Sequence, residues 1–158
     1  MNWEDSYVGQ IRKLVGHRSL IMPGPRAFVQ DGRGRTLFIQ RRGDRSWALP
    51  GGTMELGETI FEALQREVNE ETGINVISAT LIAIYSGSKV AGVDRRQNEY
   101  QLLVFQFRVD DWAGSLVTET DESVGAGFFS EGELPEAHGQ YREAFADLDR
   151  YAGNVILG

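Results

Sequence analysis

Residues 52–74 constrain the fold of this chain more than any other segment, because they combine a helical pattern with defined ends. The apolar side chains of Ile60, Leu64 and Val68 recur every four residues, and a glycine follows at position 73. Side chains at this spacing lie on one face of a helix, and glycine is common just beyond a helix C-terminus. The pattern predicts a helix over residues 59–72 that ends at Gly73.

Three glutamates on this predicted helix indicate a chemistry. A rotation of about 100° per residue places Glu71 inside the apolar arc, with Glu67 and Glu70 beside it. A glutamate-rich helix is ordinarily a solvated one, but these three carboxylates share a face that turns toward the body of the protein. Like charges held together raise one another's pKa and destabilise the helix unless a cation lies among them. The cluster therefore indicates a bound cation, and oxygen ligands favour Mg²⁺ or Mn²⁺.

Composition and charge exclude several other classes of protein. The length of 158 residues fits one domain, and we treat residues 1–158 as such. The absence of cysteine excludes disulfides, zinc-thiolate sites and cysteine nucleophiles. The start of the chain does not resemble a signal peptide, and no apolar run approaches the roughly 20 residues of a membrane helix. We expect a cytoplasmic protein, and its net charge of −7 argues against nucleic acid as a partner.

The segments around this helix alternate between strand and helix patterns. Helices are predicted over residues 7–14 and 140–151, and strands over 27–30, 36–40, 77–85, 100–109 and 125–129, with a brief apolar stretch at 47–49. The Asp31–Gly34 turn predicts that the first two strands form a hairpin, and the Pro23–Pro25 segment interrupts the apolar residues before it. Strands around a central helix with another helix at the end predict an α/β fold with a mixed sheet between helices.

The spacing of the polar residues resembles a known family signature. Gly52 and Glu58 are followed by the run REVNEETGI at residues 66–74, and together they fill every defined position of the Nudix box. The chain is thereby identified as a member of the Nudix hydrolase family. The resemblance implies a Nudix-type α/β/α sandwich with a mixed β-sheet over nearly the whole chain.

The resemblance also implies roles for residues within the box. Glu67, Glu70 and Glu71 match the family's metal-binding and catalytic glutamates, and the backbone carbonyl matching Gly52 often joins the coordination. Arg66 matches a residue that orients the glutamates through charge-assisted hydrogen bonds. Either Glu67 or Glu70 serves as the general base, so the predicted catalytic set is Glu67, Glu70 and Arg66.

Residues elsewhere complete the predicted site. A further carboxylate after the box commonly joins the metal site, and Glu122 is the candidate because it comes just before the strand at 125–129; an exposed loop acid beside Asp121 is the alternative. Arg41 and Arg42 follow a strand and suit bidentate contact with phosphate, although paired arginines there are also ordinary surface charge. Glu58 matches a residue that supports the loop or binds a further metal, and we place it with both arginines in the substrate-binding part.

The implied function is Mg²⁺-dependent hydrolysis of a diphosphate linkage in a nucleotide or nucleoside diphosphate derivative. Residues that often accompany two branches of the family are absent. ADP-ribose hydrolases often carry a proline some 15 or 16 positions beyond the box, where this chain has Lys89 and Val90. Dinucleoside polyphosphate hydrolases often carry a tyrosine slightly further on, where this chain has Ala91 and Gly92. One alternative is a non-catalytic Nudix-fold nucleotide-binding regulator. Another is an interaction protein whose acidic helix recruits a partner, which requires Glu71 to be exposed. A homodimer is expected only by analogy with such folds.

Overall fold

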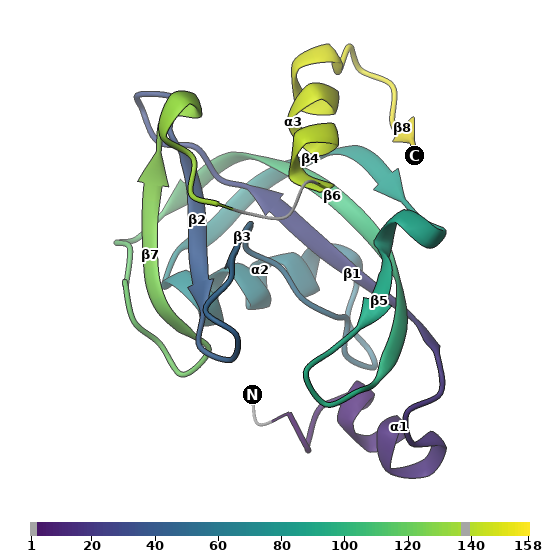
Figure 1. The fold of residues 1–158 in the computed structure, drawn as a ribbon. Helices are drawn as coiled ribbons and strands as arrows, with labels where there is room; N and C mark the ends of the chain where they lie inside the picture. Colours follow the sequence, from purple (N-terminus) through teal and green to yellow (C-terminus); the bar gives the residue numbers. More distant parts are fainter. Residues whose placement is uncertain (1–2, 137–139) are drawn as a thin grey trace.

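The computed structural model describes residues 3–136 and 140–158, which form two β-sheets with helices on both sides (Figure 1). The elements in chain order are α1 (Tyr7–Val15), β1 (Leu20–Phe28), β2 (Thr36–Arg41), β3 (Trp47–Ala48), α2 (Ile60–Thr72), β4 (Asn75–Tyr85), the 3₁₀ turn η1 (Ser88–Val90), β5 (Ala91–Val93), β6 (Glu99–Ala113), β7 (Ser123–Phe129), η2 (Glu131–Glu133), α3 (Gln140–Arg150) and β8 (Ile156–Leu157).

The larger sheet is mixed, as predicted. Its strand order is β1-β6-β4-β8, and β5 pairs with β6 at one end. Strand β1 runs parallel to β6, whereas β4 runs antiparallel to it. The smaller sheet is antiparallel in the order β3-β2-β7. This arrangement confirms the α/β class.

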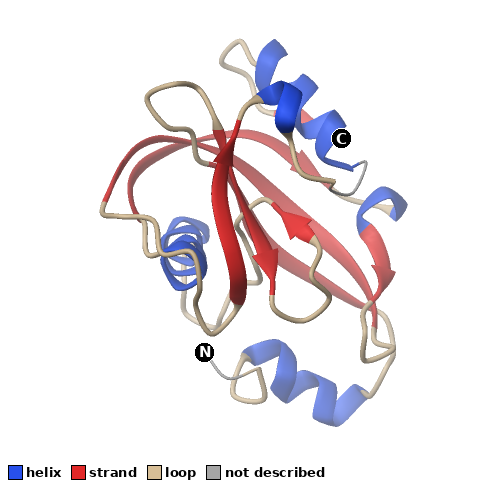
Figure 2. Ribbon diagram, turned by 60° about the vertical axis from the view of Figure 1, so that its left-hand side comes forward, coloured by secondary structure: helices blue, strands red, loops and turns tan. Residues whose placement is uncertain are grey.

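Alternation along β1 divides the core between two helices. Ala27 and Val29 are fully buried in a cluster with Leu64 of α2, whereas Phe28 is buried in a second cluster with Ala144 of α3. Successive side chains of a strand point to opposite faces, so the sheets must lie between the two helices. Figure 2 shows α2 and α3 on opposite sides of the strands.

The predicted interruption at Pro23–Pro25 is wrong, because β1 continues through both prolines. Proline cannot donate a backbone hydrogen bond, so a strand tolerates it only where its nitrogen faces away from a partner strand. The carbonyls of Pro23 and Pro25 accept from the N–H groups of Met54 and Gly52, at 3.0 and 3.2 Å. Their nitrogens therefore face the segment 50–54, and the opposite edge of β1 remains free to pair with β6.

The predicted hairpin is only partly present. The turn forms, with Gly34 N–H donating to the Asp31 carbonyl at 3.0 Å and Leu37 N–H to the Val29 carbonyl at 2.9 Å, but β1 and β2 belong to different sheets. They are joined by an isolated bridge between Gln30 and Thr36. The edge of β1 that a hairpin partner would need is occupied by the segment 50–54, where Ala27 N–H donates to the Pro50 carbonyl at 2.8 Å. Strand β2 pairs instead with β3 and β7.

The remaining predicted elements are present with small shifts at their ends, including α2, α3, β4, β6 and β7. Strands β5 and β8 were not predicted, since two or three residues are too few to show a period. Within the described residues, no helix is both long and apolar enough to cross a membrane.

Candidate active site

Both ends of α2 are fixed by local hydrogen bonds. The Thr59 hydroxyl accepts from the Glu62 N–H, while the Glu62 carboxylate accepts from the Thr59 N–H, which completes a capping box. At the other end, Gly73 adopts a left-handed φ of 74°, and its N–H donates to the Asn69 carbonyl at 2.8 Å. The two caps confirm the predicted helix and its glycine stop.

The rotation of α2 buries two of its glutamates. Glu71 is 6% exposed and Glu67 is 7% exposed, beside Leu64 and Val68, which are fully buried. The prediction that Glu71 lies on the apolar face is therefore confirmed. A solvated acidic helix face is excluded, and so is the interaction protein that required an exposed Glu71.

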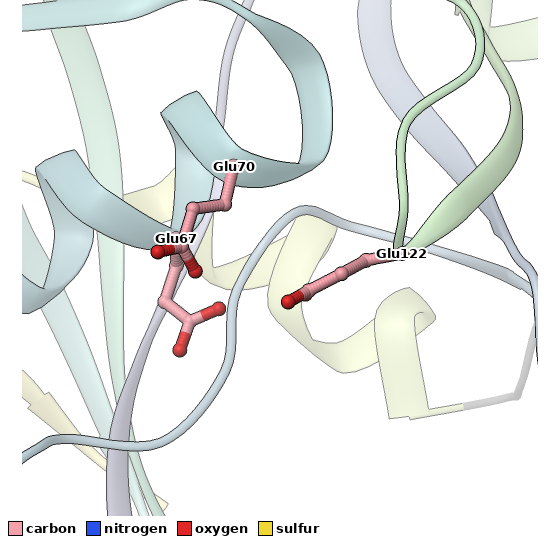
Figure 3. Close-up of side chains that lie close together, drawn as sticks. All are labelled: Glu67, Glu70 and Glu122. Atoms are coloured by element: carbon pink, nitrogen blue, oxygen red, sulfur yellow. The ribbon is translucent and has the colours of Figure 1, made fainter. Parts of the chain in front are cut away.

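Three carboxylates converge across a long sequence separation. Glu67, Glu70 and Glu122 each offer an oxygen atom, and these atoms lie within 4.8 Å of one another. Figure 3 shows Glu67 and Glu70 extending from α2 toward Glu122, which reaches over from the loop before β7. Glu122 is half-buried here. An all-oxygen donor set of this kind suits a hard divalent cation.

Glu71 stands apart from that group of three. Its Oε2 accepts the Gly51 N–H at 2.8 Å, so the carboxylate fastens the loop after β3 to α2. Burial raises the pKa of Glu71 well above its ordinary value, and the negative charge of Glu67 raises it further. Its part in metal binding stays a prediction.

Gly52 lies directly against the carboxylate of Glu67. A Cβ atom at this position would come closer than 3.0 Å to all three atoms of the Glu67 carboxyl group. Only glycine lets the backbone approach a carboxylate this closely. The contact supports the predicted neighbourhood of Gly52 and the metal site, while coordination through the Gly52 carbonyl stays a prediction.

Arg66 connects the glutamates to the loop before the helix. It donates to Glu58 at 2.5 and 3.0 Å, to Glu67 at 2.8 Å, to Glu70 at 3.4 Å and to the Thr53 carbonyl at 2.9 Å. These hydrogen bonds agree with the predicted orienting role. Arg66 also lowers the pKa of Glu58, whose carboxylate is held between Arg66 and the N–H of residue 55. Its contact with substrate stays a prediction.

The electrostatics of the group favour a bound cation. Burial raises the pKa of Glu67 to about 7, and the charges of Glu122 and Glu70 add to the rise, although the hydrogen bond from Arg66 opposes it. A buried carboxylate gains its charged form when an opposite charge lies beside it. A divalent ion among the three carboxylates would supply that charge.

The two predicted phosphate contacts, Arg41 and Arg42, differ in their surroundings. The Arg42 side chain donates to Glu119 at 3.1 Å and to the Thr120 carbonyl at 2.7 Å, and its backbone N–H donates to the Glu122 carbonyl at 2.9 Å. Arg42 thus holds the loop that carries Glu122. Burial raises the pKa of Glu71 on balance, and the positive charge of Arg41 opposes that rise. Substrate binding by either arginine stays a prediction.

Some residues that build the site carry no signal in the sequence. Gly51 and Thr53 act through a backbone N–H and a backbone carbonyl, and the role of Arg42 depends on a loop far along the chain. Backbone groups are present in every residue, so only the tertiary structure reveals which of them are used.

Comparison with known proteins agrees with the geometry. The model of the NUDIX domain matches residues 21–148. The chain belongs to the NUDIX family. The match extends well beyond the box and covers every strand from β2 to β7, nearly all of β1, α2 and most of α3, so the Nudix recognition from the sequence is confirmed.

Several Nudix proteins resemble this one. The ADP-ribose pyrophosphatase of Methanocaldococcus jannaschii is 30% identical over 120 residues, which are 74% of this chain and 67% of that protein. The Nudix hydrolase YvcI of Bacillus subtilis, itself uncharacterized, is 33% identical over 88 residues, 56% of this chain and 54% of YvcI. The alignment thus spans about half the length of YvcI. A MutT Nudix hydrolase structure from Burkholderia pseudomallei superposes with a TM-score of 0.65 at 27% identity, covering 82% of this chain and 98% of that one.

Proposed function

We propose that this Nudix protein is a Mg²⁺-dependent pyrophosphohydrolase that cleaves a diphosphate linkage in a nucleotide or nucleoside diphosphate derivative. The observation that carries the proposal is the convergence of Glu67, Glu70 and Glu122. The names of relatives agree in chemical class, since one is an ADP-ribose pyrophosphatase and another, from Homo sapiens, is an 8-oxo-dGDP phosphatase that is 38% identical over 91 residues, 57% of this chain and 25% of that protein.

The chain offers a suitable set of ligands for the metal. Glu67, Glu70 and Glu122 would hold the ion, with Glu71 and the Gly52 carbonyl as further predicted ligands. A bound divalent ion neutralises charge on the phosphate oxygens and lowers the pKa of water. The remaining steps belong to side chains of the protein.

Proton transfer falls to a glutamate beside the attacking water. Glu67 and Glu70 are the two candidates for the general base, since a carboxylate in that role must lie within hydrogen-bond reach of the proton it removes. Arg66 holds both glutamates in place through its guanidinium. Arg41, at the end of β2, is the candidate to bind a phosphate oxygen of the substrate.

Hydrolysis is tested with a panel of nucleoside di- and triphosphates, ADP-ribose and nucleoside diphosphate sugars in the presence of Mg²⁺, with chromatography to identify the products. We expect at least one compound to be cleaved at a diphosphate linkage, and turnover to fall at least about tenfold in E70Q and E122Q. The D121N variant is the matched control, because Asp121 is the exposed neighbour of Glu122. Undiminished turnover in both glutamate variants would refute the assigned roles.

A Mg²⁺ titration of thermal stability separates metal binding from catalysis. Binding to the folded state alone raises the melting temperature, and we expect this rise in the wild type and a smaller one in E122Q. A rise without turnover of any compound would favour the non-catalytic regulator. The cytoplasmic location and the homodimer stay predictions.

A further inference from the structure

A pocket on the α3 side of the mixed sheet, apart from the glutamate cluster, contains a buried arginine. The pocket has a volume of about 300 Å³ and is lined by Arg26, Tyr85, Ser86, Lys89, Val90, Glu143 and Gly158. Its lining residues come from β1, the end of β4, η1, α3 and the residue after β8, and Figure 1 shows the ends of β4 and β8 close to α3. Its size is at the lower end of small-molecule sites, which are about 300–1,000 Å³.

Arg26 is 8% exposed, and its guanidinium forms only part of the hydrogen bonds that it can donate. Its Nε donates to the Gln106 side-chain oxygen at 2.5 Å, and its central carbon lies over the rings of Tyr85 and Tyr141, at 5.5 and 5.1 Å from their centroids. Within residues 3–136 and 140–158, its two terminal nitrogens form no hydrogen bond or ion pair. No buried side-chain nitrogen or oxygen of the described residues lacks a partner, so these two nitrogens are accessible from the pocket that Arg26 lines, where a ligand can accept from them.

Arg12 shows how a purely structural arginine is satisfied in the same protein. It is 6% exposed, and its two terminal nitrogens donate to the backbone carbonyls of Gly16, Arg18 and Glu99 at 2.5–3.2 Å. Among the described residues, the terminal nitrogens of Arg26 lack such acceptors although Arg26 is about equally buried. The contrast leaves these nitrogens available to a ligand in the pocket.

The strand edge that carries Arg26 adjoins the loop that holds one of the glutamates. Arg26 pairs with Gly51 in an isolated antiparallel bridge, and the Gly51 N–H holds Glu71. A substrate whose phosphates meet the glutamates can therefore place its other end toward Arg26.

The charges around the pocket favour a neutral group with two acceptors over another anion. Glu143 lies at the pocket wall and pairs with Lys89 at 2.9 Å, and the buried Asp147 accepts the Tyr85 hydroxyl at 2.6 Å. Glu143 and Asp147 already hold the nearby cations Lys89 and Arg150, the latter at 2.6 Å, so a phosphate would have to compete with them for positive charge. A neutral base adds no charge, and the flat edge of a guanidinium binds two neighbouring acceptors in one plane.

We propose that Arg26 selects the base of the substrate by donating to the O6 and N7 acceptors of a guanine-type purine. Adenine is disfavoured because it presents an amino donor where guanine presents O6. This inference rests on the proposed function, since it assumes that the diphosphate derivative carries a base. It assigns Arg26 to specificity, not to the cleavage step.

The test is calorimetric titration of GMP, IMP, AMP and 7-deaza-GMP without metal, into the wild type, R26K and R12K. We expect GMP and IMP to bind the wild type at least about tenfold more tightly than AMP, and R26K to reduce this preference below about threefold, because lysine lacks the planar fork. R12K is the matched control for replacing a buried arginine and should keep the preference. Thermal unfolding confirms that each variant is folded.

Equal binding of AMP and GMP by the wild type would overturn the inference, and so would a preference that survives in folded R26K or an absence of binding by every nucleotide. If R26K does not fold, 7-deaza-GMP decides: binding about tenfold weaker than GMP supports the contact with N7, and equal binding overturns it. Monophosphate binding requires neither metal nor cleavage. An active hydrolase without base preference therefore refutes only this inference, and a base preference without turnover refutes only the proposed hydrolysis.

Discussion

Replacing Gly52 with alanine tests whether the close approach of backbone and carboxylate controls activity. Gly52 does not adopt a left-handed φ, so alanine fits its backbone and the effect is steric. The new Cβ would come closer than 3.0 Å to the Glu67 carboxyl group. Because carbon atoms in contact are separated by about 3.5–4.0 Å, the carboxylate has to retreat by roughly 1 Å.

The magnitude follows from that displacement. A misplacement of about 1 Å at a catalytic group can cost about 100-fold in rate, so we expect kcat/KM of G52A to fall about 100-fold. The fold should lose no more than about 1 kcal/mol, since the atoms that must move are the end of a flexible side chain. Glu67 turns away from Arg66 and from the other carboxylates as a result.

The assay compares turnover and urea unfolding of G52A with those of G32A, whose added Cβ meets no atom within 4 Å. Replacing Glu67 with the shorter aspartate should make space for the new Cβ. The double variant G52A/E67D should therefore lose less activity than the sum of the losses, in free energy, of G52A and E67D alone. Activity of G52A within about threefold of the wild type would refute the steric reasoning. A large loss of stability would show that Glu67 cannot yield as described.

Three further predictions concern stability in the absence of metal. R66A should lower the free energy of unfolding by about 2–3 kcal/mol, less than the 3–5 kcal/mol lost when a fully buried ion pair is broken, because the Arg66 side chain is 19% exposed. Urea unfolding measures this loss beside the control R42A, since the Arg42 side chain is 47% exposed. Equal losses in the two variants would contradict the prediction. Burial raises the pKa of Glu67 from 4.5 to about 7, so the folded protein retains a proton that the unfolded chain releases. The stability contributed by this group is present below pH 4.5 and is lost as the pH rises toward 7, by about 3 kcal/mol. In EDTA the wild type should lose that stability relative to E67Q, and parallel pH profiles would disprove the shift. L64A should cost about 2–5 kcal/mol in the same assay, since Leu64 is fully buried, and a cost below 1 kcal/mol would contradict the packing of α2.

Most of the regular structure could be predicted, because its signals are local. The period of α2, its threonine cap and its glycine stop all lie within a few residues of one another. Strands β4 and β6 are long enough to show their character. The failures, at β1 and at the expected hairpin, arise where distant segments compete for one strand edge.

The residues of the candidate site likewise include some that local spacing predicts and some that depend on distant segments. The wheel of α2 placed Glu67 and Glu71 on the buried side, and the structure confirms it. Arg42 is hydrogen-bonded to the loop that carries Glu122 because β2 pairs with β7 in the small sheet. No spacing in the sequence predicts this pairing. Arg26 was not singled out at all, since a lone arginine in a strand looks like surface charge until its burial is known.

The sequence by itself determined the family and the kind of chemistry, because the spacing of glutamates, arginine and glycines in residues 52–74 is a property of one helix and the loop before it. The tertiary structure decided which third carboxylate joins Glu67 and Glu70, since β7 must pair with β2 before Glu122 can reach α2. It also decided that Arg26 of β1 lines a pocket on the α3 side of the sheet. These are long-range packing outcomes, and they depend on which strand edges and faces remain available once the core has formed.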